Sequence, residues 1–381
     1  IVGSNAKGAT AFYLAGLGEA VCAESDRVGL YTSPHLHSVL DRIRLNREQI
    51  DAEHALAALA RLKERLPISR ELSYFELLTA LAWLIFQEAR SPLQIFEAGL
   101  GGRFDATRIA RAQTVVLTRI ELEHTGVLGS TPEAILAEKL GIISRHCRRV
   151  CYMPQPQLSD EQVRAGIAAQ IEALDWPADQ PPPAVHAWQR PADSTEPQDY
   201  RAENLAFARF VLGRIVADSP AFVNAGDART ALARIASYDP GPPPGRLERR
   251  QVGNTTVYFD VAHNPPAIER SLKDLAAGCD PGAGYEVWLG LLADRDLAAC
   301  VDAVRAAGYQ HLRILTGPGF ATPSPLRHAG TAEQLPLLSL DDPAGGRARL
   351  AAIEARGERP TVVLLGSHRI YNYFVDLTEG R

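Results

Sequence analysis

The chain has 381 residues, which is too long for one typical domain and predicts two or three. With 46% hydrophobic and 22% charged residues, it has the composition of an ordinary soluble globular protein that buries sizeable cores. The formal net charge of −5 argues against nucleic-acid binding, which usually needs a basic balance, so an anionic ligand has to be held by local positive groups.

Cysteine usage and the apolar runs indicate a cytoplasmic protein without a membrane partner. The five cysteines, at positions 22, 147, 151, 279 and 300, are few and scattered, as expected for reduced thiols. Cys147 and Cys151 are four residues apart, but no second pair accompanies them, so we do not expect a zinc site. No signal peptide is visible, and the longest apolar run, from Leu77 to Phe86, is too short to span a bilayer and predicts a buried helix.

The first ten residues, IVGSNAKGAT, predict the end of a buried strand, a turn of small residues and a helix that continues to about Ala20. Such a turn directs several backbone N–H groups at one spot, and the helix adds its unpaired N–H groups and its positive dipole end. A polyphosphate fits there, with Lys7 neutralising its outer charge. The match to G-x-x-x-x-G-K-[ST] is partial, because Ala6 replaces the last glycine, and a purely structural turn is the alternative.

The next hundred residues alternate between predicted strands and helices. Strands are expected at 28–31, 41–46, 93–96 and 114–118, and helices at 52–66, 74–89 and from Thr131 onward. This alternation indicates a parallel sheet covered by helices. In such sheets ligands gather at the carboxyl ends of strands, where the polar residues of this part of the chain fall.

The second half contains the strongest domain boundary. The stretch 154–197 is rich in Pro, Gln, Ala and Asp and predicts strand remnants joined by long surface loops, and a helix is expected at 204–215. The segment DPGPPPG at 239–245 predicts the boundary between domains 1–239 and 240–381. Beyond it, strands are expected at 255–260, 285–289, 311–315 and 361–365, and helices at 267–277, 297–307 and 348–355.

Several motifs then match one family in order. They are GSNAKGAT, GLYTSPHL with DRIRLN, SYFELLTA, FEAGLGGRFDAT, IELEHTGVLGSTPEAILAEKLGII, PGRLE, YFDVAHNP, GLLADRD and LLGSH. Their order resembles the folylpolyglutamate synthase/dihydrofolate synthase family of the Mur ligase superfamily over nearly the whole chain. The resemblance implies an α/β fold: an N-terminal P-loop-type Mur-ligase central domain (1–239) with a mostly parallel sheet, and a smaller C-terminal Rossmann-like α/β domain (240–381).

The resemblance also implies an activity. Family members are ATP-dependent ligases that attach L-glutamate to a folate or dihydropteroate carboxylate through an acyl phosphate, in folate biosynthesis and one-carbon metabolism. ATP and Mg²⁺ would be required, the partners would be a pterin or folate acid and L-glutamate, and the chain would be a monomer. Phosphoryl transfer depends on positioned phosphates and cations more than on a protein nucleophile, which agrees with the residues present.

Site residues follow by resemblance in the same way. The ATP contacts are Ser4, Asn5, Ala6, Lys7, Gly8, Asn204, Arg246 and Asp260. The metal ligands are Ser33, Glu97 and His124. The catalytic residues are Lys7, His263 and Lys139, the last matching the lysine that this family carbamylates. The pterin-binding residues are Tyr74, Phe75, Glu76, Phe104, Asp105 and Ala106.

Simpler interpretations stay open for several of these residues. In these interpretations, Ser33 is only a turn residue before Pro34, and His124 only caps a helix. Tyr74 and Phe75 would then be core residues, and Lys139 a plain surface lysine. Two further ion pairs are alternatives: Arg103 with Asp105, both solvated, and Arg246 with Asp239. Glu97 is harder to explain without a ligand, because a carboxylate ending an apolar strand needs a cation or donors.

The chain departs from the family pattern near the nucleotide and the substrate. The phosphate loop is usually GTNGKGS or GTNGKGT, so Ala6 and Ala9 are unusual, and Thr10 is a candidate replacement for the hydroxyl lost at position 9. The other departures are Arg108 for asparagine, Glu123 for aspartate, and Tyr200-Arg201 for His-Gln. The rival hypotheses are a Mur-type ligase acting on another carboxylate and a non-catalytic nucleotide-binding homologue. A dinucleotide-dependent dehydrogenase is excluded because G-x-G-x-x-G is absent.

Overall fold

The computed structural model describes residues 1–66, 71–190, 199–218, 227–276, 285–322, 326–328, 331–333, 335–355 and 360–380. The chain divides into two compact units, one formed by residues 1–197 and 201–241 and the other by residues 198–200 and 242–381. The main passage between them falls inside the Pro- and Gly-rich stretch 239–245. Among the described helices, none has the length and apolar character needed to cross a membrane.

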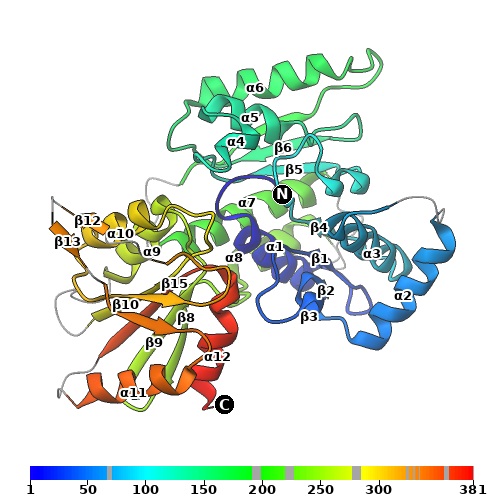
Figure 1. Cartoon of the computed structure of the whole chain (residues 1–381). Helices are drawn as coiled ribbons and strands as arrows, with labels where there is room; N and C mark the ends of the chain where they lie inside the picture. Colours follow the sequence, from blue (N-terminus) through cyan, green and yellow to red (C-terminus); the bar gives the residue numbers. More distant parts are fainter. Residues whose placement is uncertain are drawn as a thin grey trace. The chain divides into compact units, whose positions relative to one another are not determined.

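The first unit contains short strands with helices around them (Figure 1). Its strands are β1 (Gly29–Tyr31), β2 (Ile43–Leu45), β3 (Glu48–Gln49), β4 (Gln94–Phe96), β5 (Thr114–Leu117), β6 (Arg149–Tyr152) and β7 (Ala184–Ala187). Its helices are α1 (Lys7–Val21), α2 (Ala52–Arg65), α3 (Tyr74–Glu88), α4 (Thr125–Leu128), α5 (Pro132–Leu140), α6 (Asp160–Ala173), α7 (Tyr200–Asp218) and α8 (Ala228–Ser237), with 3-10 helices η1 (Val39–Arg42) and η2 (Ala106–Ala110).

The start of the chain joins two groups of strands. One group has the order β3-β2-β1-β4, in which β1 and β4 are parallel, and the other is the parallel set β5-β6-β7. Val2 pairs in parallel with Leu117 of β5, and Ile1 O accepts a hydrogen bond from Ala98 N, just past β4, at 3.0 Å. The segment that leads into α1 is therefore held between the ends of β4 and β5.

Three apolar clusters fix the helices of this unit. α1 is apolar on nearly all sides and packs with α7 and α8, as Leu17 and Phe207 show. α5 and α6 pack on β5 and β6 through residues such as Ile135 and Ile167. α2 and α3 cover β1 and β4 around Phe86. The strands are thus covered by helices, as the alternating pattern predicts.

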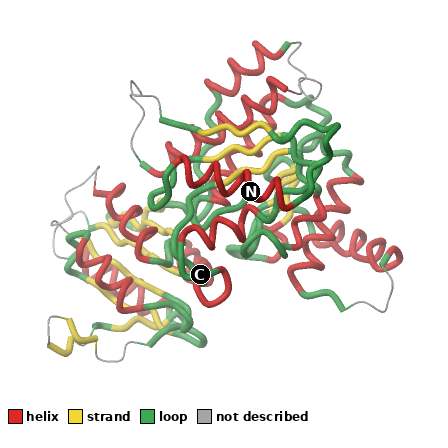
Figure 2. Tube along the Cα trace, turned by 90° about the horizontal axis from the view of Figure 1, so that it is seen from above, coloured by secondary structure: helices red, strands yellow, loops and turns green. Residues whose placement is uncertain are grey.

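The second unit is a six-stranded sheet with the order β14-β11-β10-β15-β9-β8, parallel except for the edge strand β8. Its strands are β8 (Glu248–Val252), β9 (Thr255–Asp260), β10 (Tyr285–Gly290), β11 (Leu312–Thr316), β14 (Leu337–Ser339) and β15 (Thr361–Gly366), with a separate hairpin of β12 (Leu326–His328) and β13 (Thr331–Glu333). Its helices are α9 (Pro265–Ala276), α10 (Leu297–Ala306), α11 (Pro343–Glu354) and α12 (Tyr371–Glu379), with a 3-10 turn η4 (His368–Ile370). Figure 2 shows helices alongside the strands within each unit.

The structure confirms most of the expected elements and contradicts one. The prediction of strand remnants and long loops at 154–197 is wrong for residues 160–173, which form α6, whereas β7 at 184–187 is a short strand of the expected kind. Ser159 and Gln162 form a reciprocal capping box at the start of α6, a helix-start signal that the composition of the stretch obscures. Among the elements that were not expected are β6, α6, α8, β8, β14 and α12.

Candidate active site

The predicted phosphate loop is a tight turn fastened to the chain beyond β5. Thr118 Oγ1 donates to Asn5 O at 2.7 Å. A Cβ added to Gly3 would lie only 1.9 Å from Thr118 Oγ1. Ser4 Oγ donates to Glu121 O at 2.9 Å and accepts from Glu121 N at 3.0 Å. The amide of Asn5 also donates to the Glu121 carboxylate. Position 3 therefore has room only for glycine, and the loop has a fixed shape.

Ala6 takes the left-handed backbone conformation, with φ 72° and ψ −5°, at the N-cap of α1. This conformation is one that glycine adopts without strain and that other L residues rarely adopt. Thr10, in the first turn of α1, is fully buried, and its hydroxyl has no hydrogen-bond partner in the described structure. Successive helical residues point about 100° apart, so Thr10 faces a different direction from Ala9, and its role as a replacement stays a prediction.

Two lysine ammonium groups converge on one carbonyl of the loop. Lys7 Nζ donates to Gly3 O at 2.8 Å and to Ser4 O at 3.2 Å. Lys139 Nζ donates to the same Gly3 O at 2.9 Å and to Glu123 Oε1 at 2.7 Å. Lys139 is only 1% exposed, so the surface-lysine interpretation is wrong.

The electrostatics of this group follow from burial and charge. Burial, together with the nearby charge of Lys7, lowers the pKa of Lys139 to about 8. For Glu123, burial works to raise the pKa, but the positive charges of Lys7 and Lys139 hold it below the ordinary glutamate value. A buried ammonium is thus paired with a carboxylate beside the predicted phosphate position.

The predicted metal ligands come from three separate strand ends. Glu97 directly follows β4, is 4% exposed and accepts from Ser33 N at 3.0 Å through Oε2. His124 is exposed, has φ 45° and stands at the N-cap of α4 without a side-chain capping bond, so it does not cap that helix as a side chain. Among the described residues no group of three His, Cys, Asp or Glu side chains is placed to hold a metal ion. A metal at Glu97 and His124 would need oxygens from Ser33 and from phosphate or water, a set that suits Mg²⁺.

The predicted pterin-binding residues lie on α3 and on the loop before η2. The rings of Tyr74 and Phe104 are 57% and 89% exposed, and Arg42 lies over the Tyr74 ring at 5.5 Å. Phe75 is partly buried, with its ring 5.9 Å from that of Tyr31. A Cβ on Gly99 would meet the Phe75 ring at 2.8 Å, so the two segments are in close contact.

The two carboxylates in this set make local hydrogen bonds. Glu76 forms a reciprocal capping box with Ser73 at the start of α3. Asp105 is buried and accepts from Gly99 N and Leu100 N through Oδ2, and from Thr107 through Oδ1. Arg103 pairs with Glu138 at 3.1 Å, which contradicts the alternative of a solvated Arg103–Asp105 pair. Ala106 begins η2.

Of the remaining predicted residues, Asn204 is 2% exposed within α7. Asp260 ends β9, is 3% exposed and accepts from Leu247 N and Ala262 N, each at 2.9 Å, and from the Tyr200 hydroxyl. Burial raises the pKa of Asp260, against the opposing charge of Arg246. The positive charge of Arg246 therefore stabilises the ionised form of the buried Asp260 carboxyl.

His263 follows shortly after Asp260. Its Nδ1 lies 2.7 Å from Val261 O, and since a carbonyl only accepts, Nδ1 carries the proton. In the neutral ring Nε2 then holds the lone pair. Sequence reasoning missed the bonds made by Thr118, Glu121 and Tyr200, because such contacts arise only from the tertiary fold.

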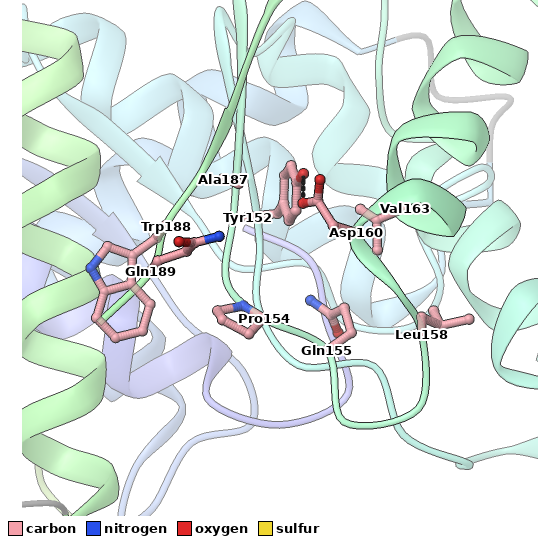
Figure 3. A pocket seen from close by; sticks show the side chains of 9 residues that line it. All are labelled: Tyr152, Pro154, Gln155, Leu158, Asp160, Val163, Ala187, Trp188 and Gln189. Atoms are coloured by element: carbon pink, nitrogen blue, oxygen red, sulfur yellow. Dashed lines mark hydrogen bonds between the residues drawn. The ribbon is translucent and has the colours of Figure 1, made fainter. Parts of the chain in front are cut away.

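A small cavity of about 120 Å³ lies at the carboxyl ends of β6 and β7 (Figure 3). Its lining is Tyr152, Pro154, Gln155, Leu158, Asp160, Val163, Ala187, Trp188 and Gln189, none of which is a predicted site residue. The Tyr152 hydroxyl donates to Asp160, and Gln155 bonds Ile120 N and Thr118 O. The cavity is smaller than a typical ligand pocket of about 300 Å³ or more.

Comparison with known proteins points to one family. The chain is 34% identical to the dihydrofolate synthase/folylpolyglutamate synthase of Haemophilus influenzae, over 77% of this chain and 68% of that protein. It is 29% identical to the Escherichia coli protein of the same name, over 100% and 86%. It is 31% identical to the folylpolyglutamate synthase of Lacticaseibacillus casei, over 87% and 78%. No model of a protein family matches the chain.

Solved structures agree with the fold. Mycobacterium tuberculosis folylpolyglutamate synthase complexed with ADP superposes with a TM-score of 0.77 at 24% identity, covering 100% of this chain and 89% of that one. Escherichia coli FolC in complex with DHPP and ADP gives 0.74 at 25% identity, covering 100% and 88%. Both support the predicted Mur-ligase-like α/β architecture.

Proposed function

The chain belongs to the folylpolyglutamate synthase/dihydrofolate synthase family, and we propose that it is an ATP- and Mg²⁺-dependent ligase that adds L-glutamate to a folate or dihydropteroate carboxylate. The observation that carries the proposal is the fixed loop of residues 3–6 leading into α1, with Lys7 and Lys139 converging on it. A loop of this kind presents backbone N–H groups and positive charge to a polyphosphate. The likeness to the Escherichia coli protein solved with DHPP and ADP supports both ligand classes.

The reaction has two balanced steps. A carboxylate oxygen of the acid attacks the terminal phosphorus of ATP, forming an acyl phosphate while ADP leaves. The amino group of glutamate then attacks the acyl carbon, forming the amide, while phosphate leaves and the amine loses a proton. Residues Ser4 to Gly8 hold the phosphates, and Lys7 stabilises the negative charge that accumulates on the terminal phosphate.

A divalent cation would be held by Ser33, Glu97 and His124. The residues fit a hard cation, because the buried Glu97 carboxylate stands at a strand end where a positive charge would stabilise it. When bound, the ion supplies charge neutralisation at the phosphate oxygens. Removing it with EDTA is expected to abolish phosphate release, and adding excess Mg²⁺ to restore it.

For the acid substrate, Tyr74 and Phe104 offer exposed aromatic faces on which a flat heterocycle can stack. Phe75, Glu76, Asp105 and Ala106 complete this proposed pterin-binding set on the basis of the resemblance. For ATP, the proposed further contacts are Asn204, Arg246 and Asp260. His263 is proposed to act at the amino-acid substrate, since it follows Asp260 closely at the end of β9.

Lys139 is the proposed carbamylation site. The amine must lose its proton before Nζ attacks the carbon of CO₂, and a pKa of about 8 leaves a neutral fraction at physiological pH. Glu123, which pairs with the ammonium form, opposes the anionic carbamate. A ¹³C NMR spectrum in labelled bicarbonate is expected to show a carbamate resonance that is missing from Lys139→Met. A wild-type spectrum without that resonance would mean that Lys139 works as an ammonium group.

The deciding experiment is phosphate release from ATP with Mg²⁺ and L-glutamate, with dihydropteroate or tetrahydrofolate added in turn. Release that requires one pterin acid would establish the ligase and choose between the two activities. Release that requires a different carboxylate would favour a divergent Mur-type ligase, and nucleotide binding without release would favour the non-catalytic homologue. Lys7→Ala is expected to abolish release, whereas Arg61→Ala, which removes a surface ion pair with Glu88, should not.

We also propose a cytoplasmic monomer. The cysteines described in the structure, at positions 22, 147, 151 and 300, are buried and unbonded to one another. Sedimentation of the purified chain would test the oligomeric state.

A further inference from the structure

The turn between β2 and β3 holds an arginine in an unusual conformation. Asn46 and Arg47 are its two central residues, with φ 53° and 61°. A two-residue hairpin turn of this kind needs positive φ at both positions and favours Asn followed by Gly. Asn46 fits, and its Oδ1 accepts from Val28 N at 2.8 Å. Arg47 adopts a conformation that residues other than Gly, Asn and Asp rarely visit.

The Arg47 side chain makes three contacts far from its own hairpin. Nε donates to both carboxylate oxygens of Glu19 at 3.0 Å, and Nη1 donates to Pro240 O at 2.5 Å. The guanidinium lies over the Phe12 ring at 5.2 Å. The Arg47 and Glu19 side chains are 20% and 17% exposed, so the pair is mostly shielded from water. Such a pair is stronger than one on the open surface.

These contacts follow one stripe of α1, the helix that begins at the phosphate loop. Phe12, Gly16 and Glu19 are four and three residues apart and therefore lie on one helix face. A Cβ on Gly16 would lie 2.5 Å from Pro240 Cβ and 2.9 Å from Arg47 Cζ. The missing side chain at position 16 is what allows Pro240 and the guanidinium to lie against α1.

Pro240 is where the first unit ends. It is buried, and the unit passes into the second after Gly241. Gly241 has φ 74°, and its N–H donates to Asp239 Oδ1 at 2.9 Å, which closes a tight turn at this point. The carbonyl that Arg47 holds is therefore at the exit of the first unit.

We propose that Arg47 is a positioning residue that fixes the exit of the first unit, at Pro240, against the helix that begins at the phosphate loop. A residue in a strained conformation persists where its surroundings hold it, and such residues concentrate at functional positions. The kinetic consequence rests on the proposed ligase function, in which groups of both units take part. Releasing the exit segment then slows the reaction while leaving nucleotide binding by the phosphate loop intact.

Hydrogen exchange of the wild type and Arg47→Gly tests the attachment itself. Glycine suits the positive φ, so this variant removes the side chain without straining the turn. The amides of residues 238–249 are expected to exchange about tenfold faster in Arg47→Gly, with those of α1 unchanged. Glu19→Gln, which leaves the turn untouched, should give a smaller increase in the same segment. Arg61→Ala, which breaks the Arg61–Glu88 pair at 2.7 Å, is the matched control and should change neither segment.

Kinetics then test the positioning role. In Arg47→Gly, kcat is expected to fall about tenfold or more while the Kd for ADP stays within about twofold, and Arg47→Lys should restore part of the rate. Unchanged exchange at 238–249 would overturn the proposal, because Arg47 would then not hold the exit segment. Faster exchange spread through the whole first unit would also overturn it, because Arg47 would then act only on overall stability. A loosened segment with an unchanged kcat would also overturn it. If the wild type shows no ligase activity, loosening confined to 238–249 still supports the attachment and contradicts only the proposed function.

Discussion

Replacing Ala6 by glycine should stabilise the protein, although glycine usually weakens the interior of a helix. Ala6 has φ 72° and makes no side-chain capping bond. Holding a non-glycine residue in the left-handed conformation costs about 1–2 kcal/mol relative to glycine. Glycine gives back about 0.4–1 kcal/mol because it makes the unfolded chain more flexible. The net expectation is a gain of about 0.5–1 kcal/mol in the free energy of unfolding.

Urea denaturation of the wild type, Ala6→Gly and Ala9→Gly measures this gain. Ala9 is the matched control, because it undergoes the same change three residues later inside α1, where φ is helical and the residue is 1% exposed. Ala9→Gly should lose about 1 kcal/mol through helix propensity, and more because it removes a buried methyl group. Equal destabilisation of the two variants would refute the reasoning, since Ala6 would then carry no backbone strain. Isothermal titration is expected to show that ADP binds Ala6→Gly at least as tightly as the wild type.

Three more results are expected. Lys139→Met leaves the Glu123 carboxylate buried without its cation and should lose about 3–5 kcal/mol in urea denaturation, whereas Lys273→Met, on the exposed side of α9, should lose almost nothing. The pKa of Lys139 in the folded state, about 8, lies below the ordinary lysine value of 10.5, so the folded state binds fewer protons between these values and this group makes the free energy of unfolding rise with pH from about 8 to 10.5. A denaturation series compared with Lys139→Met isolates the effect, and a difference that does not change with pH would contradict it. Phe104→Ala should raise the KM for the pterin acid without changing the melting temperature or the Kd for ADP, whereas Val127→Ala, which is 72% exposed, should change none of the three.

Local signals explain how much of the fold the sequence predicts. The helix at 74–89 is predicted from its long apolar run, and the structure adds a capping box of Ser73 and Glu76 at the start of α3. The same signal at Ser159 and Gln162 lies in a stretch dominated by Pro, Gln and Asp, and there composition misled the prediction. Alternating strands and helices predict layers, but they do not predict that the first three residues lie between β4 and β5.

Some features of the candidate site are predicted from local sequence, whereas others arise only from tertiary contacts. The loop of residues 3–8 is predicted from its own residues, because small residues and a lysine before a helix are a local pattern. The attachment of that loop to Thr118 and Glu121 joins residues more than a hundred positions apart, and no local pattern encodes it. The same holds for Lys139, whose local surroundings suggest a surface residue although it is 1% exposed.

The two lysines at the loop are held differently, and this separates their roles. Lys7 is bonded only to the neutral carbonyls of Gly3 and Ser4 in the contacts seen here, so an incoming phosphate offers its flexible side chain a stronger, charge-assisted partner. Lys139 is buried and paired with Glu123, and leaving that position would strand a carboxylate in a shielded site. We therefore expect Lys7 to follow the outer phosphate during the reaction. Lys139 in its uncarbamylated ammonium form stays in place and keeps Gly3 O, and with it the shape of the loop, fixed.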